Sequence, residues 1–155
     1  MPQYMAMIKG SEGSEACDNI PNTPESRAAN QNMLASMTKF NESLVDAGVL
    51  VEMGGLTPTK DAARISYSKD EPKVTHGPFD LEKERFMCGF WIIEAKDLDE
   101  AVGWIKKAHF QGGEVTVHKV GCAHKFPGYT DEIRQREEKI RAAIKGKGID
   151  PSLCD

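Results

Sequence analysis

Short apolar runs alternate with segments of helical period along the first 120 residues of the chain. Apolar runs at residues 4–8 (YMAMI), 49–53 (VLVEM) and 90–93 (FWII) predict three strands. The first and the last of these are continuous enough to be covered on both faces of a sheet. Residues 115–120 alternate Val with polar side chains after a Gly-Gly turn, which predicts a fourth strand.

Two segments between these strands have the helical period. In the first, Thr23 is a suitable N-cap, Pro24 fits the first helical position and Gly48 predicts the end. The stripe expected to face the sheet comprises Met33, Met37, Phe40, Leu44 and Ala47. In the second, Asp97 precedes Glu100 by three residues, a pattern close to a capping box. Its buried stripe is expected to comprise Leu98, Ala101, Val102, Ile105 and Ala108.

The remaining segments have a weaker pattern. Residues 10–24 (GSEGSEACDNIPNTP) mix small polar residues with Pro, which predicts a long and mobile loop. Residues 63–67 (ARISY) predict a half-exposed strand, and residues 73–84 predict an irregular hairpin. Residues 130–145 are expected to form an exposed helix with i,i+4 charge pairs, and residues 147–155 to be poorly ordered.

The order of these elements predicts the fold class. Strand, helix, two strands, hairpin, strand, helix and strand correspond to an α+β domain, a ferredoxin-like βαββαβ unit with an inserted hairpin, over residues 1–120. Residues 121–155 are expected to form a C-terminal extension with one exposed helix. Such a fold places both helices on one sheet face, so apolar side chains of residues 90–93 lack a cover on the other. We therefore expect a homodimer packed sheet to sheet.

Composition and charge exclude several function classes. With 155 residues, of which 39% are apolar, the chain can form one domain with tails. Its net charge of -4 argues against a nucleic-acid binder and against a polybasic membrane binder. Apolar stretches are all far shorter than the roughly 20 residues of a membrane span, so a soluble, cytoplasmic protein is expected. The four cysteines are widely spaced without a CxxC pair, which favours reduced thiols.

A family resemblance lies in residues 74–94 (VTHGPFDLEKERFMCGFWIIE) and 98–108 (LDEAVGWIKKA). These residues resemble the YCII-related family, in particular the branch named for its Asp-Gly-Pro-Phe motif, and the likeness covers about residues 3–120. The motif's leading Asp is His76 here, and the usual Arg-Pro of the last strand is replaced by His118-Lys119. The resemblance implies a dimeric α/β-barrel. Most of the family has no assigned reaction, some members resemble companions of alternative sigma factors, and one branch is linked to dehydrochlorination of a hydroxyquinone.

Five residues are candidates for a site. His76 opens a Gly-Pro turn and could act as a general base, because an imidazole titrates near neutral pH. Glu84 could orient that ring, and Arg64 could anchor an anionic substrate through its two-pronged guanidinium. Phe79 could wall a pocket for a flat ligand, and His118 is a further candidate for substrate binding. Each also has a structural interpretation, as a turn residue, a surface charge or a core residue.

A metal site is the weaker alternative for one group of residues. His118, Cys122 and His124 offer imidazole and thiolate, the ligands that zinc prefers. A closed site needs a fourth ligand, and the nearest candidate, His109, lies across a glycine turn. We therefore predict neither a metal nor another cofactor.

Three functions remain open at this stage. The leading hypothesis is a dimer that binds a small anionic or aromatic metabolite between the hairpin and the sheet. The first alternative is a cofactor-independent lyase or isomerase in which His76 is the acid/base, Glu84 orients it and Arg64 anchors the substrate. The second alternative, implied by the resemblance, is a regulatory companion in sigma-factor signalling.

Overall fold

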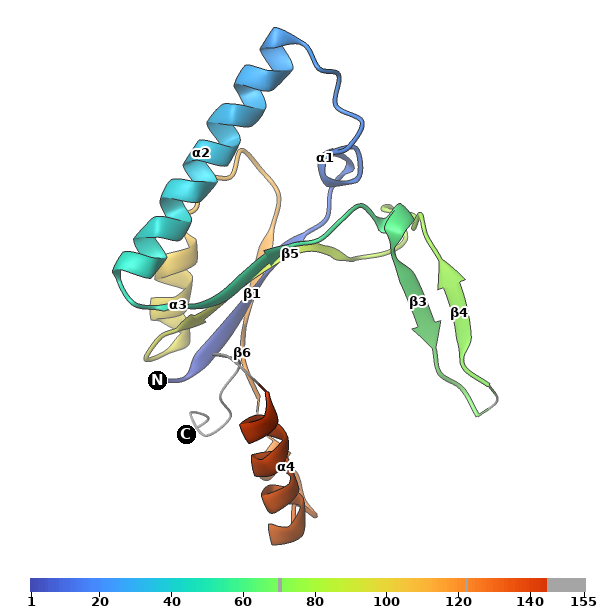
Figure 1. Cartoon of the computed structure of the whole chain (residues 1–155), viewed down its shortest axis with the longest axis vertical. Helices are drawn as coiled ribbons and strands as arrows, with labels where there is room; N and C mark the ends of the chain where they lie inside the picture. The colour runs from blue at the N-terminus through green and yellow to red at the C-terminus, as the bar shows by residue number, and fades with distance from the viewer. Residues whose placement is uncertain (70, 122, 145–155) are drawn as a thin grey trace.

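The computed structural model describes residues 1–69, 71–121 and 123–144 of the chain. At its centre is a four-stranded antiparallel sheet with the strand order β2-β5-β1-β6 (Figure 1). Its strands are β1 (Gln3–Lys9), β2 (Leu50–Gly55), β5 (Met87–Glu94) and β6 (Val115–Lys119). The antiparallel α+β class is confirmed, and the strand order is compatible with a ferredoxin-like unit.

Two helices cover one face of this sheet. In α2 (Pro24–Asp46), the Thr23 side chain accepts a hydrogen bond from the Ser26 backbone, which satisfies a free N–H of the first turn. Gly48 follows the helix with a φ of 69°, a conformation that other residues rarely adopt. In α3 (Leu98–Ile105), the Asp97 carboxylate accepts from the Glu100 N–H as predicted.

The core lies between these helices and the sheet. Because side chains alternate along a strand, the register of β1 against β5 places Tyr4, Ala6 and Trp91 on the helix-covered face. The buried core comprises Tyr4, Ala6, Phe40, Leu44, Val49, Trp91, Ile93, Ala95, Ala101 and Ile105. The side chains of Met5, Met7 and Ile92 are therefore on the face opposite the helices.

The predicted apolar stripe of α2 is buried only in part. Phe40 and Leu44 are buried, and Met37 packs against the core. The predictions for Met33, which is 59% exposed, and for the exposed Ala47 are wrong. The N-terminal half of the helix extends beyond the sheet, so its apolar side chains have no strand beneath them (Figure 1).

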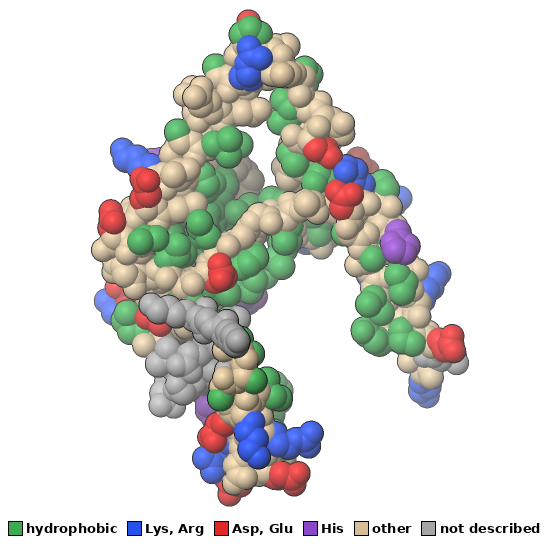
Figure 2. Space-filling model, viewed as in Figure 1, with side chains coloured by type: hydrophobic (Ala, Val, Ile, Leu, Met, Phe, Trp, Pro, Cys, Tyr) green, Lys and Arg blue, Asp and Glu red, His purple; other side chains and the backbone are tan. Residues whose placement is uncertain are grey.

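A separate two-stranded antiparallel sheet, here called the ribbon, projects from the main sheet (Figure 1). It consists of β3 (Ala63–Ser66) and β4 (Lys73–His76). The strand predicted over residues 63–67 is present as β3, but the prediction that one of its faces is buried is wrong, because Ile65 is 51% and Tyr67 78% exposed. Figure 2 shows hydrophobic side chains at the surface of the ribbon. Arg64 pairs with Thr75 and Ala63 with His76, so alternation places Arg64 and His76 on opposite faces of the ribbon.

Residues 10–24 contain a short helix, α1 (Glu12–Glu15), where the sequence predicts a loop throughout. The Ser11 hydroxyl accepts from the Ser14 N–H, and the Ser14 hydroxyl accepts from the Ser11 N–H. This reciprocal capping box satisfies two backbone donors at the start of the helix. A helix of four residues is too short to leave a detectable apolar period in the sequence.

The C-terminal segment contains a one-turn helix, η2 (Ala123–Lys125), and the helix α4 (Asp131–Ala143). The exposed helix predicted over residues 130–145 is confirmed over Asp131–Ala143, and its apolar positions Ile133 and Ile140 are 40% and 61% exposed. Residues 147–155 lie outside the described part of the chain. Among the described residues, no helix is long and apolar enough to cross a bilayer.

Candidate functional site

A cavity of about 640 Å³ lies where the base of the ribbon meets the end of the main sheet. Met7 of β1 and Thr116 of β6 line it from the sheet face opposite the helices. Its apolar lining comprises Met7, Leu56, Ala62, Phe79, Phe86 and Met87, and its polar lining comprises Lys9, Thr57, Thr59, Arg85, Glu114 and Thr116. Binding sites for small organic molecules typically have volumes of about 300 to 1,000 Å³.

Gly77 and Phe79 of the Gly-Pro-Phe sequence shape one wall of this cavity. A short helical turn, η1 (Thr59–Asp61), passes so close to Gly77 that a Cβ atom there would lie 1.7 Å from the Thr59 carbonyl oxygen. Glycine is therefore required by the close approach of two backbones. The Gly77 N–H donates to the Ala62 carbonyl at 2.9 Å, and the Phe79 N–H donates to the Thr59 hydroxyl at 2.9 Å. These contacts hold the Phe79 ring in the cavity wall.

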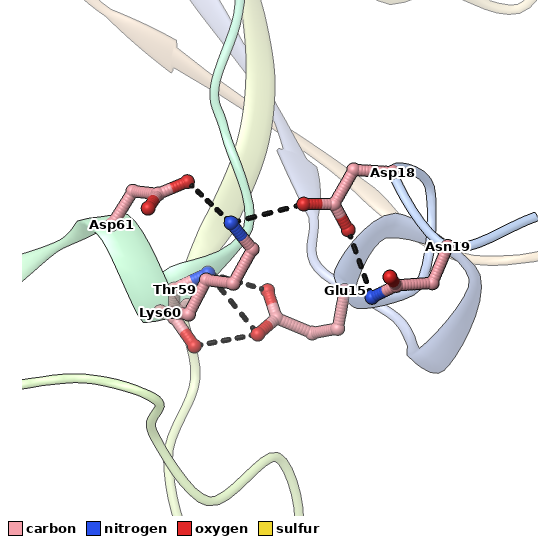
Figure 3. A network of polar contacts seen from close by, with 6 residues as sticks. All are labelled: Glu15, Asp18, Asn19, Thr59, Lys60 and Asp61. Carbon is pink, nitrogen blue, oxygen red and sulfur yellow. Dashed lines mark hydrogen bonds and ion pairs between the residues drawn. The ribbon is translucent and has the colours of Figure 1, made fainter.

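Thr59 joins the cavity wall to α1. Its side chain is buried, and both its N–H and its hydroxyl donate to the Glu15 carboxylate, at 3.0 Å and 2.5 Å respectively (Figure 3). The same hydroxyl oxygen accepts from the Phe79 N–H. A single threonine thus connects three segments that are far apart in the sequence.

Lys60 reinforces this junction from the outside. Its ammonium group lies 2.9 Å from Asp18 and 3.0 Å from Asp61 (Figure 3). Hydrogen bonds to these two carboxylates raise the pKa of Lys60 above its usual value. The segment of residues 10–24 is thereby attached to η1 by two sets of polar contacts, which the sequence pattern did not indicate.

Arg64 and Glu84, both candidates from the sequence, form an ion pair with each other. The Arg64 guanidinium carbon lies 4.4 Å from the centroid of the Phe79 ring, so it stacks on the aromatic face. Neither residue is part of the cavity lining. Arg64 thus packs on Phe79 while Glu84 neutralises its charge, an arrangement that the sequence analysis did not consider.

A turn at Asp80 positions Glu84 for this contact. The Glu84 N–H donates to the Asp80 carbonyl at 2.9 Å. The Asp80 carboxylate accepts from Lys83 at 2.8 Å and from the Glu82 N–H at 3.0 Å, and these bonds lower the pKa of Asp80 below its usual value. The side chain of Asp80 thus closes the turn that follows Phe79.

The two candidate histidines lie outside the cavity lining. His76 is exposed, on the ribbon face opposite Arg64, so the structure does not bring it together with Glu84. His118 is exposed on β6 and lies opposite Met5. Cys122, a member of the hypothetical metal site, lies outside the described residues. Within the described ranges, no group of three or more His, Cys, Asp or Glu side chains could hold a metal ion.

Of the five candidate residues, Phe79 is the one that lines the cavity, and the sequence analysis did not select Arg85 and Phe86, which also line it. Both lie directly before the central strand and beside the hairpin, and this position was the available signal. Phe86 packs closely on Gly10, where an added Cβ would lie 2.3 Å from its ring. Lys9 lines the cavity and pairs with Glu114 at 3.4 Å.

These features define an antiparallel α+β protein in which the segments flanking an inserted ribbon line a cavity at the end of the main sheet. The chain belongs to the YCII-related domain family, which matches residues 3–120, so the family predicted from the sequence is confirmed. It is 31% identical over 81 residues to an uncharacterised protein of Rhizobium meliloti. That alignment covers 52% of this chain and 64% of the relative, so the chain spans less than two thirds of the relative's length. Membership of the Asp-Gly-Pro-Phe branch stays a prediction.

Proposed function

We propose that this protein binds a small organic molecule in the cavity at the base of the ribbon. The observation that carries the proposal is the lining of the cavity, in which two aromatic rings, Phe79 and Phe86, accompany a limited set of polar groups. Pockets for small molecules combine a mainly apolar wall with a few polar groups that orient the ligand.

Phe79, which lines the cavity, is held in place by several contacts, and this favours ligand binding with little rearrangement. Phe79 is held by a backbone hydrogen bond to Thr59 and by the Arg64 guanidinium on its ring. Thr59 is itself held by Glu15. A wall that is ordered before the ligand arrives reduces the entropy lost on binding.

Binding without chemistry is the function that this geometry favours. The enzyme alternative requires His76 within hydrogen-bond reach of its substrate and of an orienting carboxylate. His76 is exposed and is not a cavity residue, and Glu84 is engaged by Arg64. We therefore do not extend the proposal to catalysis.

Filling the cavity tests the proposal. Thr116→Trp places an indole ring on the exposed cavity side of the edge strand β6. N-phenylnaphthylamine, a neutral apolar probe that fluoresces when it is removed from water, should bind the unmodified protein. The variant is expected to bind it about tenfold more weakly or worse, equivalent to ~1.4 kcal/mol, because the ring occupies the probe's space.

The matched control is Thr38→Trp, the same substitution at an exposed position of α2 that does not line the cavity. It should bind the probe as the unmodified protein does. Circular dichroism establishes that both variants are folded. Equal probe affinity in the two variants would show that the probe binds elsewhere and would contradict the proposal.

We also propose that the chain forms a homodimer through the sheet face opposite the helices. Apolar side chains support this, since Met5, Met7 and Phe90 are only half-buried on that face. Sedimentation velocity at micromolar concentration should give twice the chain mass, 2 × 17.1 = 34.2 kDa. A single species of 17.1 kDa would exclude the dimer. The measurement should use the unmodified chain, because Ile92 on that face is already buried and a charge there would also disturb folding.

A further inference from the structure

The cavity is cationic although the chain as a whole is acidic. Its charged lining residues are Lys9, Arg85 and Glu114, which give a net charge of 2 - 1 = +1. The complete chain carries -4. A positive site on a negative protein is unexpected from composition and indicates that the cavity favours a ligand of opposite charge.

The two cations differ in whether they already have a partner. Lys9 lies 3.4 Å from Glu114, and this ion pair stands at the exposed rim. The Arg85 side chain makes no ion pair or hydrogen bond with any residue in the described part of the chain. Its guanidinium is therefore available to a ligand. The N–H donors of a guanidinium can form two parallel hydrogen bonds to the two oxygens of an acidic group.

Arg64, which the sequence favours as the anion anchor, is not available in this way. Glu84 neutralises it, and the face of its guanidinium is occupied by the Phe79 ring. A second anion at Arg64 would have to displace Glu84. Of the two cations that line the cavity, Arg85 is the one without an ion-pair partner among the described residues.

We infer that the ligand is an apolar molecule that ends in one anionic group, such as a carboxylate, and that Arg85 binds this group. The apolar part then lies against Phe79 and Phe86 in the cavity. This inference rests on the proposed binding function and adds the chemical class and the orientation of the ligand. One net positive charge in the lining matches one anionic group.

A pair of probes separates the two claims. Anilinonaphthalene sulfonate and N-phenylnaphthylamine share the same aromatic body, and only the first carries an anionic group. In Arg85→Gln, the anionic probe is expected to bind about three- to tenfold more weakly, because an exposed guanidinium contributes less than a buried one. The neutral probe should change by less than about twofold.

The matched control is Arg136→Gln, which removes the same charge from an exposed position on α4 that is not part of the cavity lining. Both probes should bind this variant as they bind the unmodified protein. Salt provides an independent readout, since raising the ionic strength should weaken binding of the anionic probe alone. The salt effect should be smaller in Arg85→Gln.

Competition extends the test to a carboxylate. Octanoate should displace N-phenylnaphthylamine at a lower concentration than octanamide does, because the two share a chain and differ in charge. In Arg85→Gln the two competitors should become equivalent. Equivalence already in the unmodified protein would overturn the inference.

The outcomes distinguish the inference about Arg85 from the proposed binding function on which it rests. If Arg85→Gln weakens both probes equally or neither, the anionic class is wrong, while the loss of neutral-probe binding in Thr116→Trp still supports the cavity as a binding site. If Thr116→Trp changes neither probe, the binding function itself is wrong and the inference fails with it. Selective loss of the anionic probe in Arg85→Gln supports both.

Discussion

Replacing Gly77 with Ala is expected to destabilise the base of the ribbon and to weaken probe binding together. The added Cβ would lie 1.7 Å from the Thr59 carbonyl oxygen, a backbone atom that cannot rotate away. Overpacking of this kind costs ~1 to 3 kcal/mol, and more when backbone must move. Urea unfolding followed by circular dichroism measures the loss of stability. N-phenylnaphthylamine fluorescence measures the effect on the cavity, because Phe79, two residues after Gly77, lines it.

Gly103→Ala is the contrasting control for this prediction. Gly103 lies within α3, and an added Cβ there meets no atom within 4 Å. Alanine has a higher helix propensity than glycine, so the free energy of unfolding should rise by ~0.5 to 1 kcal/mol. If Gly77→Ala lowers the free energy of unfolding and Gly103→Ala raises it, the close approach of the backbone at Gly77, and not the loss of a glycine, decides the change in stability. If Gly77→Ala unfolds at the same urea concentration as the unmodified protein, η1 does not constrain the motif.

Removing the Trp91 side chain should produce the largest loss of stability in the core. Its ring is 3% exposed and contacts Phe40 edge to face, with 5.4 Å between the ring centroids. Its indole N–H donates to the Asn41 side chain at 2.9 Å. Truncation of a buried Trp to Ala costs ~3 to 5 kcal/mol, a large part of the ~5 to 15 kcal/mol that stabilises a typical domain.

Trp104→Ala provides the comparison, since the chain has two tryptophans. Trp104 is only partly buried at the edge of the same core, where Lys107 lies 3.7 Å from its ring centroid. Its truncation should cost less than that of Trp91, because less apolar surface returns to water. Urea denaturation of both variants checks the order, and equal losses would contradict the position of Trp91 at the centre of the core.

The main sheet and its helices could be predicted because their signals are local. Thr23, Pro24 and Gly48 mark the ends of α2 by backbone chemistry that involves only neighbouring residues. The apolar run at residues 90–93 predicts a central strand, and it lies between β1 and β2 in the sheet. Burial of α2 was overestimated at Met33, because periodicity does not reveal where the sheet beneath a helix ends.

The ribbon and the cavity could not be predicted in the same way. Alternation over residues 63–67 is compatible with a buried face, and only the pairing of β3 with β4 outside the main sheet leaves Ile65 and Tyr67 exposed. Among the candidate residues, Arg64 and Glu84 were selected for their chemistry. Arg64 and Glu84 contact each other across twenty residues of sequence, and Arg64 also lies over the Phe79 ring, which no local pattern indicates.

By itself, the sequence determined the α+β class, the family and the positions of the main strands and helices, since these depend on periodicity, caps and motifs within short segments. The tertiary structure alone decided which residues line the cavity. Glu15 and Thr59 meet across 44 residues, and Lys9 and Glu114 across 105. Contacts at such separations depend on how the strands and the ribbon are placed in space, and no local pattern of apolar and polar residues records that placement.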